Sequence, residues 1–202
     1  MKPLLKAIKE RRLYLDGGMG SMLQAAGLPE GLLPDVWGIQ NPEAIQAVHR
    51  QYLEAGCRLI ATNTFGTTPQ KLAPYGVTCE EVMAAAVANV RAAMAQAGVT
   101  DGYVMADVGP TGKLLKPYGD LDFEDAVSFF AKTVRAAAKA GADAILIETM
   151  SDLYEMKAAV VAAKENCDLP IFASLIFDST GKLLTGGSPR AAVALLDNGI
   201  FY

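Results

Sequence analysis

An α/β fold is predicted for this chain, in the form of an incomplete (β/α)8 barrel, or TIM barrel, with parallel strands. Short apolar runs alternate with amphipathic helical segments along the 202 residues, which is typical of successive βα units. Polar residues end several different apolar runs instead of gathering at one position in the sheet. No run is followed by the G-x-G-x-x-G pattern of dinucleotide-binding sheets, so a barrel is favoured over a doubly wound sheet.

Five segments are expected to form strands because they are short, rich in apolar residues and bounded by turn residues. They are residues 13–16, 58–64, 103–107, 144–148 and 171–177. The last residues, Ile200, Phe201 and Tyr202, have the pattern expected of the start of a sixth strand. Because a closed barrel needs about 250 residues, we expect one domain over residues 1–202 that holds about five βα units and is cut off at its C-terminal end. Such a partial barrel has open edges at its first and last strands.

Helices are predicted between the strands by apolar periodicity and by residues that commonly cap helix ends. The expected helices are residues 42–55, 79–97, 123–140, 153–165 and 189–198. The expected N-cap residues are Asn41, Thr78, Asp122, Asp152 and Ser188. A glutamate follows both Thr78 and Asp152 after three residues, as in a capping box.

Composition and charge exclude several classes of protein. Hydrophobic residues make up 51% and charged residues 20% of the sequence, as in soluble globular proteins and unlike disordered chains. A net charge of −4 without a basic stripe argues against a nucleic-acid partner. No apolar run approaches the ~18–20 residues of a transmembrane helix. The N-terminal residues mix charged and apolar side chains, which argues against a signal peptide. We therefore expect a cytoplasmic protein without a membrane partner.

Histidine and cysteine are scarce, which limits the chemistry to be expected. His49 is the only histidine and is expected at the surface or in a second layer, so acid–base catalysis by histidine is not expected. Cys57, Cys79 and Cys167 are far apart in the sequence. Their odd number and wide spacing argue against a disulfide framework and against a local zinc knuckle. We expect them to be small buried thiols.

Polar side chains end several of the predicted strands. Asp16, the segment 62–64 (Thr-Asn-Thr), Asp107 and Glu148 all stand at such ends. Parallel strands of a barrel end at one face, and an unpaired buried carboxylate is costly, so these side chains indicate a shared cleft for a polar ligand that carries an amine. The alternative is that each of them caps a helix or bonds a neighbouring loop, which suits Asp16 and Asp107 because glycine turns follow them.

Several motifs carry a resemblance to a known family. They are LDGGMGSML (15–23), NPEAIQAVHRQYLEAGCRLIATNTFG (41–66), DVGPTG (107–112), ADAILIETMSDLYEMKAA (142–159) and LTGGSP (184–189). In this order they resemble the homocysteine S-methyltransferase domain family from about residue 10 to residue 199. The likeness is closest to the N-terminal homocysteine-binding module of cobalamin-dependent methionine synthases, and looser to betaine–homocysteine methyltransferases.

The resemblance implies a (β/α)8 barrel that binds homocysteine and zinc at its C-terminal face. Zinc holds the homocysteine sulfur as a thiolate, which attacks a methyl group, because Zn²⁺ lowers the pKa of a bound thiol. Glu148 matches the glutamate that holds the α-amino group of the substrate, as a charge-assisted pair. The residues assigned to homocysteine binding by the resemblance and by their positions at strand ends are Asp16, Gly17, Thr62, Asn63, Thr64, Asp107 and Glu148.

This sequence departs from the family in its cysteines. The zinc thiolates of the family come from a cysteine that ends strand six and from a Cys-Cys pair near strand eight, and the sequence ends before these positions. Cys57 and Cys167 precede strands and are expected at the opposite face, and Cys79 falls in the first turn of a helix. We therefore expect neither a metal site nor catalytic residues here, and no activity of this chain alone. Zinc, and cobalamin as methyl carrier in the methionine synthase case, are expected of the full-length family member with its methyl-donor module.

Other readings stay open on the sequence alone. The methyl donor implied by the family can be methylcobalamin, betaine, S-methylmethionine or another compound. The chain can also be a non-catalytic partial barrel that is completed by a partner or by self-association. An aldolase or a phosphate-binding isomerase is a further alternative, which is disfavoured because no lysine ends a predicted strand.

Overall fold

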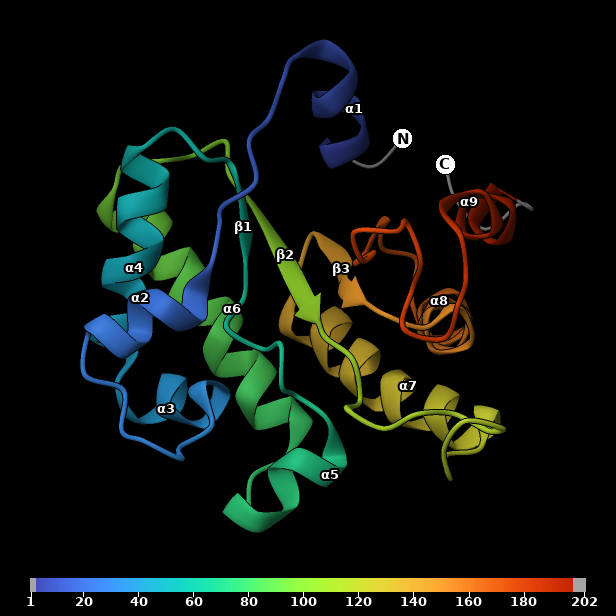
Figure 1. Cartoon of the computed structure of the whole chain (residues 1–202). Helices are drawn as coiled ribbons and strands as arrows, with labels where there is room; N and C mark the ends of the chain where they lie inside the picture. Colours follow the sequence, from blue (N-terminus) through green and yellow to red (C-terminus); the bar gives the residue numbers. More distant parts are fainter. Residues whose placement is uncertain (1–2, 198–202) are drawn as a thin grey trace.

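The structure is a computed structural model, which describes residues 3–197 and forms an α/β fold around one parallel sheet (Figure 1). Each strand lies next to the one that follows it in the sequence. The strands, in order across the sheet, are β1 (Leu59–Ala61), β2 (Tyr103–Val108), β3 (Ala144–Met150) and β4 (Ile171–Leu175). The predicted parallel α/β class is therefore confirmed. The expected sixth strand at residues 200–202 lies outside the described residues.

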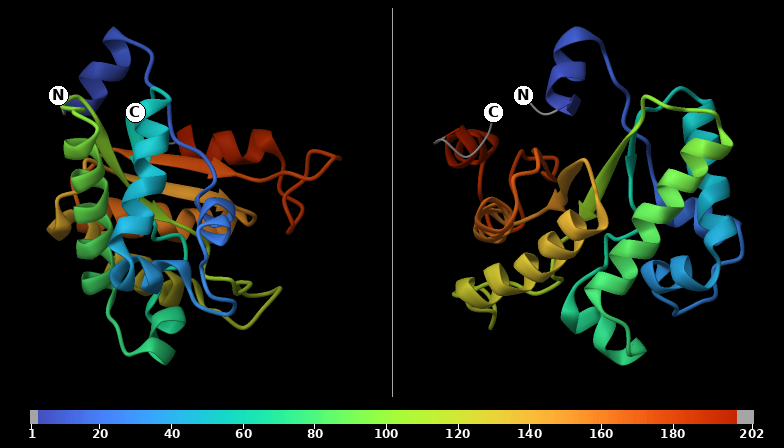
Figure 2. Two further views of the ribbon diagram at one scale, coloured as in Figure 1. Left: turned by 90° about the vertical axis from the view of Figure 1, so that its left-hand side faces the viewer. Right: turned by 180° about the vertical axis from the view of Figure 1, so that it is seen from behind.

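The long helices lie along one face of this sheet (Figure 2). They are α4 (Pro42–Glu54), α6 (Cys79–Gln96), α7 (Phe123–Ala140) and α8 (Leu153–Asn166), and α9 (Pro189–Asp197) follows β4. Ile60, Val104 and Ile145 point from the sheet into the core between it and the helices, where each is completely buried. The predicted helices are thus present, with ends that differ by at most one residue from the expected ones where both ends are described. Within residues 3–197, no helix combines the length and hydrophobicity that crossing a bilayer requires.

The predicted caps are only partly observed. Thr78 and Glu81 form the expected capping box, with the Thr78 N–H donating to the Glu81 carboxylate at 2.8 Å. Asn41 and Asp122 occupy the predicted N-cap positions, but neither side chain makes a capping hydrogen bond. The Asp122 carboxylate instead pairs with the Lys116 ammonium, 2.9 Å away, which leaves the first turn of α7 without a side-chain cap.

Asp152 and Ser188 do cap their helices. Asp152 accepts the Glu155 N–H at 2.7 Å, and Ser188 accepts the Ala191 N–H at 3.2 Å. The Glu155 side chain does not return to Asp152 as a capping box requires, because it bonds to Thr111 in the loop after β2. That carboxylate therefore ties a loop to α8 instead of closing the cap.

The first predicted strand, residues 13–16, is reduced to a single parallel bridge between Leu15 and Leu59. The second is shorter than expected and ends at Ala61, because the chain turns back on itself where the Thr64 N–H donates to the Thr62 carbonyl at 2.9 Å. Polar side chains at both places take over bonds that a regular strand would make through its backbone.

Several short helices were not predicted. They are α1 (Pro3–Glu10), α2 (Met19–Ala25), α3 (Pro34–Gln40), α5 (Pro69–Leu72) and the 3-10 turn η1 (Ala73–Tyr75). Apart from α1, each is too short to show an apolar period, and α3 and α5 begin at a proline that also reads as a loop residue.

The sheet face away from the long helices, called here the inner face, carries a smaller apolar cluster. Leu59, Met105 and Leu146 alternate with the outward-pointing residues and pack together near the start of the strands. Leu4 of α1 is buried against them, with 1% of its surface exposed. The helix α1 thus covers the N-terminal end of the inner face (Figure 1).

The same alternation places acidic residues further along the inner face. Asp107 stands two residues after Met105 on β2, and Glu148 stands two residues after Leu146 on β3. Because the strands are parallel, both side chains reach the C-terminal edge of the sheet.

Candidate functional site

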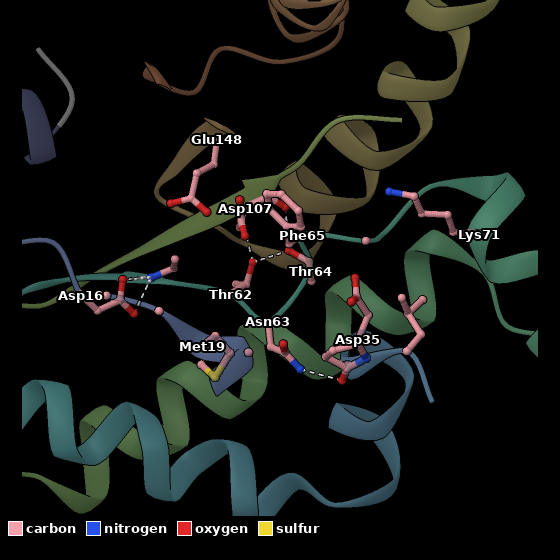
Figure 3. A pocket seen from close by; sticks show the side chains of 17 residues that line it. Asp16, Met19, Asp35, Thr62, Asn63, Thr64, Phe65, Lys71, Asp107 and Glu148 are labelled. Atoms are coloured by element: carbon pink, nitrogen blue, oxygen red, sulfur yellow. Dashed lines mark hydrogen bonds between the residues drawn. The ribbon is translucent and has the colours of Figure 1, made fainter. Parts of the chain in front are cut away.

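A cavity of about 460 Å³ lies at the C-terminal ends of β1, β2 and β3 (Figure 3). It lies between the sheet and the loops that lead into α2, α3 and α5. The cavity brings together all the residues that the sequence assigned to binding, namely Asp16, Gly17, Thr62, Asn63, Thr64, Asp107 and Glu148. The polar strand ends therefore converge on one cavity, as expected.

Asp16 is held at the edge of the sheet by its own side chain. Both of its carboxylate oxygens lie 3.1 Å from the backbone nitrogen of Ala61. Burial raises the pKa of Asp16 to about 7; the Ala61 N–H works against that rise, and the nearby charge of Glu148 adds to it. Asp16 therefore bonds to the backbone of a neighbouring segment, which is the alternative that the sequence left open, and it also lines the cavity.

The two threonines form a closed ring of hydrogen bonds with the backbone of Asp107. The Asp107 N–H donates to the Thr62 hydroxyl at 3.0 Å, and the Thr64 hydroxyl donates to the Asp107 carbonyl at 2.7 Å. The two hydroxyl oxygens lie 2.6 Å apart. Because the Thr64 hydroxyl already donates its proton to the Asp107 carbonyl, the Thr62 hydroxyl is the donor between them. This ring fastens the end of β1 to the end of β2 and leaves no free hydroxyl proton for a ligand.

Asp107 has the most unusual environment in the cavity. Its side chain is 5% exposed, and its Oδ1 atom has no hydrogen-bond partner among the described residues. Burial raises the pKa of Asp107 well above its usual value, and the charges of Glu148, Asp35 and Asp16 raise it further. A buried, unsatisfied carboxyl oxygen that faces a cavity is suited to receive a hydrogen-bond donor from a ligand.

Glu148 reaches into the cavity from the end of β3, close to Asp107 (Figure 3). It is half-buried, and burial raises the pKa of its carboxyl. Asp16, Asp107 and Glu148 lie toward one side of the cavity, and Lys71 lies at the far side (Figure 3). Three carboxyl groups that have no adjacent cation within residues 3–197 favour a positively charged group of a ligand on their side.

Asn63 and Gly17 shape the cavity wall. The Asn63 amide donates to the Pro34 carbonyl at 2.7 Å and so holds the start of α3 against the sheet. Gly17 lies under Tyr52, whose hydroxyl donates to the Gly18 carbonyl at 3.0 Å. A Cβ atom on Gly17 would stand 3.1 Å from that hydroxyl, so the loop after Asp16 packs closely against α4.

Among the cavity residues that were missed from the sequence, three carry charged or aromatic side chains. Asp35 accepts the Thr67 hydroxyl at 2.6 Å, and Lys71 donates to the Pro110 carbonyl at 2.8 Å. Phe65 stands at the mouth with 41% of its surface exposed. Phe65 could have been found because it continues the Thr-Asn-Thr segment, whereas Asp35 and Lys71 read as ordinary charges in segments where no helix or strand was predicted.

Of the two positions expected for His49, the surface and a second layer, the structure excludes the surface. It is completely buried on α4, and neither ring nitrogen has a partner among the described residues. Burial lowers the pKa of His49 to about 4. It does not line the cavity and contributes nothing to its chemistry.

The described residues do not fit a zinc site built from thiolates. Within residues 3–197, no group of three or more His, Cys, Asp or Glu side chains is placed to hold a metal ion. None of the three cysteines lines the cavity. Cys57 donates to the Leu15 carbonyl, Cys79 contacts the Thr133 hydroxyl, and Cys167 donates to the Ala163 carbonyl. No chemical step through a metal is therefore assigned to these residues.

Two known methionine synthases are similar to this chain. The chain is 30% identical to the methionine synthase of Mycobacterium tuberculosis (strain ATCC 25618 / H37Rv) and 28% identical to that of Mycobacterium leprae (strain TN), each over 96% of this chain. It spans only 17% of the length of either relative.

Among solved structures, the homocysteine methyltransferase MmuM of Escherichia coli is similar in two forms. The metallated form has a TM-score of 0.84 at 25% identity over 98% of this chain and 75% of that chain. The oxidized form has a TM-score of 0.83 at 26% identity over 97% of this chain and 73% of that chain. The family model for homocysteine S-methyltransferase matches residues 13–201. The chain belongs to the homocysteine S-methyltransferase family.

Proposed function

We propose that this chain is the homocysteine-binding part of a homocysteine S-methyltransferase that makes methionine. The observation that carries the proposal is the convergence of Asp16, Asp107 and Glu148 on one cavity, where Asp107 has an unsatisfied oxygen. Such a site suits the ammonium group of an amino acid. The likeness to methionine synthases supports the choice of amino acid and of reaction.

In this proposal the residues of the chain bind and orient the amino acid. The Glu148 carboxylate accepts the α-ammonium group, and the Asp107 Oδ1 atom offers a second acceptor beside it. Asp16 adds negative charge on the same side, while Gly17 and the segment 62–64 form the wall that limits where the thiol side chain can lie.

The thiol chemistry is proposed to depend on groups outside these 202 residues. In the full-length family member, bound zinc would supply a thiolate at neutral pH. Cobalamin is proposed as the methyl carrier, held on a separate methyl-donor module, because the similar methionine synthases are far longer than this chain. We therefore expect this chain alone to bind homocysteine weakly and to transfer no methyl group.

The same reasoning extends to the architecture. We propose that residues 1–202 are one domain and that the sheet, with the bridge at Leu15, is the first part of a (β/α)8 barrel with about five βα units. The match to MmuM supports this, since nearly all of this chain aligns to about three quarters of that protein. We keep the expectation that the protein acts in the cytoplasm.

The proposal can be tested by comparing two thiols that differ only in the amino group. L-homocysteine and 4-mercaptobutyrate are titrated into the chain while amide shifts of the cavity residues are followed by NMR. Glu148→Gln is expected to weaken L-homocysteine binding roughly 10–100-fold, the range of a charge-assisted hydrogen bond, and to leave 4-mercaptobutyrate unchanged. Glu165→Gln, on the exposed side of α8, is the matched control. Equal binding of L-homocysteine by Glu148→Gln and the wild type would contradict the proposal.

A second candidate function is a non-catalytic partial barrel completed by a partner or by self-association. Within residues 3–197, β4 pairs only with β3, so its other edge is open for pairing. Ile176, just beyond β4, has 54% of its surface exposed. Both observations favour this candidate. Size-exclusion chromatography with light scattering separates the two. A defined oligomer supports this candidate, and a well-behaved monomer at all concentrations counts against self-association.

A further inference from the structure

The strand that carries Glu148 is irregular directly after that residue. β3 and β4 pair in register up to Ile147 with Ala173, but the next pair is Met150 with Leu175. Two residues of β3 therefore face a single residue of β4, and this arrangement is a β-bulge. Bulges often occur beside functional sites, where they change the direction of a side chain.

The two residues that meet at the bulge are Thr149 and Ser174. Thr149 has a φ of 59°, and it is the one residue other than glycine with a positive φ in the part of the chain that the structure describes. A β-branched residue is strained in this conformation. The Thr149 N–H donates to the Ser174 hydroxyl at 2.9 Å, so a side chain of β4 takes the place of the backbone partner that the bulge removes.

The bulge also decides which residues enter the core. Ile147 and Met150 are both completely buried in the core under the helices, whereas Glu148 is half-buried and Thr149 is exposed. In a regular strand, residues three apart point to opposite faces, and Met150 would be on the inner face. The extra residue keeps the Met150 side chain in the core under the helices. Glu148 is then the last side chain of β3 on the inner face, and it is directed into the cavity (Figure 3).

We propose that Ser174 is a positioning residue, which holds the bulge at Thr149 and thereby keeps the Glu148 carboxylate in the cavity where it meets an ammonium group. The identity of the ligand rests on the proposed function, whereas the role of Ser174 rests on the geometry of the bulge. Ser174 does not line the cavity, so its effect on binding is indirect.

The placement of Glu148 can be measured without any ligand. The chain is labelled with ¹³C at the glutamate carboxyls, and the pKa of Glu148 is followed by NMR in the wild type, Ser174→Ala, Ser174→Thr and Ser128→Ala. Burial raises this pKa in the wild type. We expect Ser174→Ala to lower it toward the ordinary value as Glu148 moves into solvent, and Ser174→Thr to restore it. Ser128, exposed on α7, is the control and should leave it unchanged.

Ligand binding gives the second measurement. Ser174→Ala is expected to weaken L-homocysteine binding roughly 2–10-fold, which corresponds to the loss of one neutral hydrogen bond. Binding of 4-mercaptobutyrate, which lacks the amino group, should stay at the wild-type level, and Ser174→Thr should recover the L-homocysteine affinity. If the serine only stabilised the fold, Ser174→Ala would instead weaken the binding of both thiols to the same extent.

The outcomes separate this inference from the proposed function. An unchanged Glu148 pKa in Ser174→Ala overturns the inference, as does an equal loss for both thiols. If Ser174→Ala moves the pKa but wild-type protein binds L-homocysteine no better than 4-mercaptobutyrate, the proposed function fails and the positioning role stands.

Discussion

Both carboxylate oxygens of Asp16 lie 3.1 Å from the backbone nitrogen of Ala61, at the point where β1 ends. Two residues before Ala61 the two segments pair through their backbones, with the Asp16 N–H donating to the Leu59 carbonyl at 3.0 Å. In a regular parallel ladder the next bond would go from the Ala61 N–H to a backbone carbonyl. The carboxylate of Asp16 takes that place, so the same side chain ends the strand pairing and faces the cavity.

This double role predicts how Asp16 variants behave. Asp16→Ala leaves the part-buried Ala61 N–H without an acceptor and should lower the free energy of unfolding by about 1–3 kcal/mol. Asp16→Asn keeps an acceptor and should recover most of that loss. Urea denaturation measures both, with the exposed Asp120→Ala as control. Equal stability of Asp16→Ala and wild type would show that the bond to Ala61 contributes nothing.

The raised pKa of Asp16 predicts a pH dependence of stability with a definite sign. The pKa is about 7 in the folded chain against an ordinary 3.8, so between these values the folded state holds a proton that the unfolded state has lost. The free energy of unfolding contributed by Asp16 is therefore present at low pH and falls as the pH rises from about 4 to about 7. The stability of wild type relative to Asp16→Asn should fall over this range. A difference that stays constant, or that grows with pH, contradicts the assignment.

The repeated βα pattern and the meeting of polar strand ends could be predicted because they depend on features with a clear sequence period. Apolar runs such as 144–148 end in a polar residue, and parallel strands must end at one edge. The capping box at Thr78 and Glu81 was predictable because it involves only neighbours in the sequence.

The features that were missed depend on contacts between distant residues. Nothing around Asp16 indicates that its side chain replaces a backbone acceptor for Ala61, so a full strand was expected there. Likewise, the run that contains Glu148 reads as regular, and the bulge is visible only when Ser174 of the neighbouring strand is in place. For His49 the sequence left both the surface and a second layer open, and only the packing of α4 shows that it is buried.

His49 predicts a pH dependence of stability that is opposite in sign to that of Asp16. Its pKa is lowered by burial to about 4, so between that value and an ordinary 6.5 the unfolded state binds a proton that the folded state lacks. Stability contributed by His49 is lost as the pH falls through this range. His49→Leu removes the titrating group and two nitrogens without partners among the described residues, and should be neutral or stabilising at pH ~7. In thermal melts at several pH values, the melting temperature of His49→Leu should fall less steeply towards acid pH than that of the wild type. An equally steep fall in both proteins would exclude His49 as its cause.

The loop after β2 gives the most direct test of the cavity wall. A Cβ atom on Gly109 would stand 2.3 Å from the Phe65 carbonyl oxygen, which belongs to the backbone and cannot move aside. Gly109→Ala should therefore push the two loops apart and destabilise the chain by about 1–3 kcal/mol, the usual range for overpacking. Gly20→Ala is the matched control, since Gly20 lies in α2 with nothing within 4 Å of the added carbon, and should gain about 0.5–1 kcal/mol from helix propensity. Urea denaturation of both variants gives the comparison. Equal stability changes would mean that the close contact between Gly109 and Phe65 does not hold the cavity wall in solution.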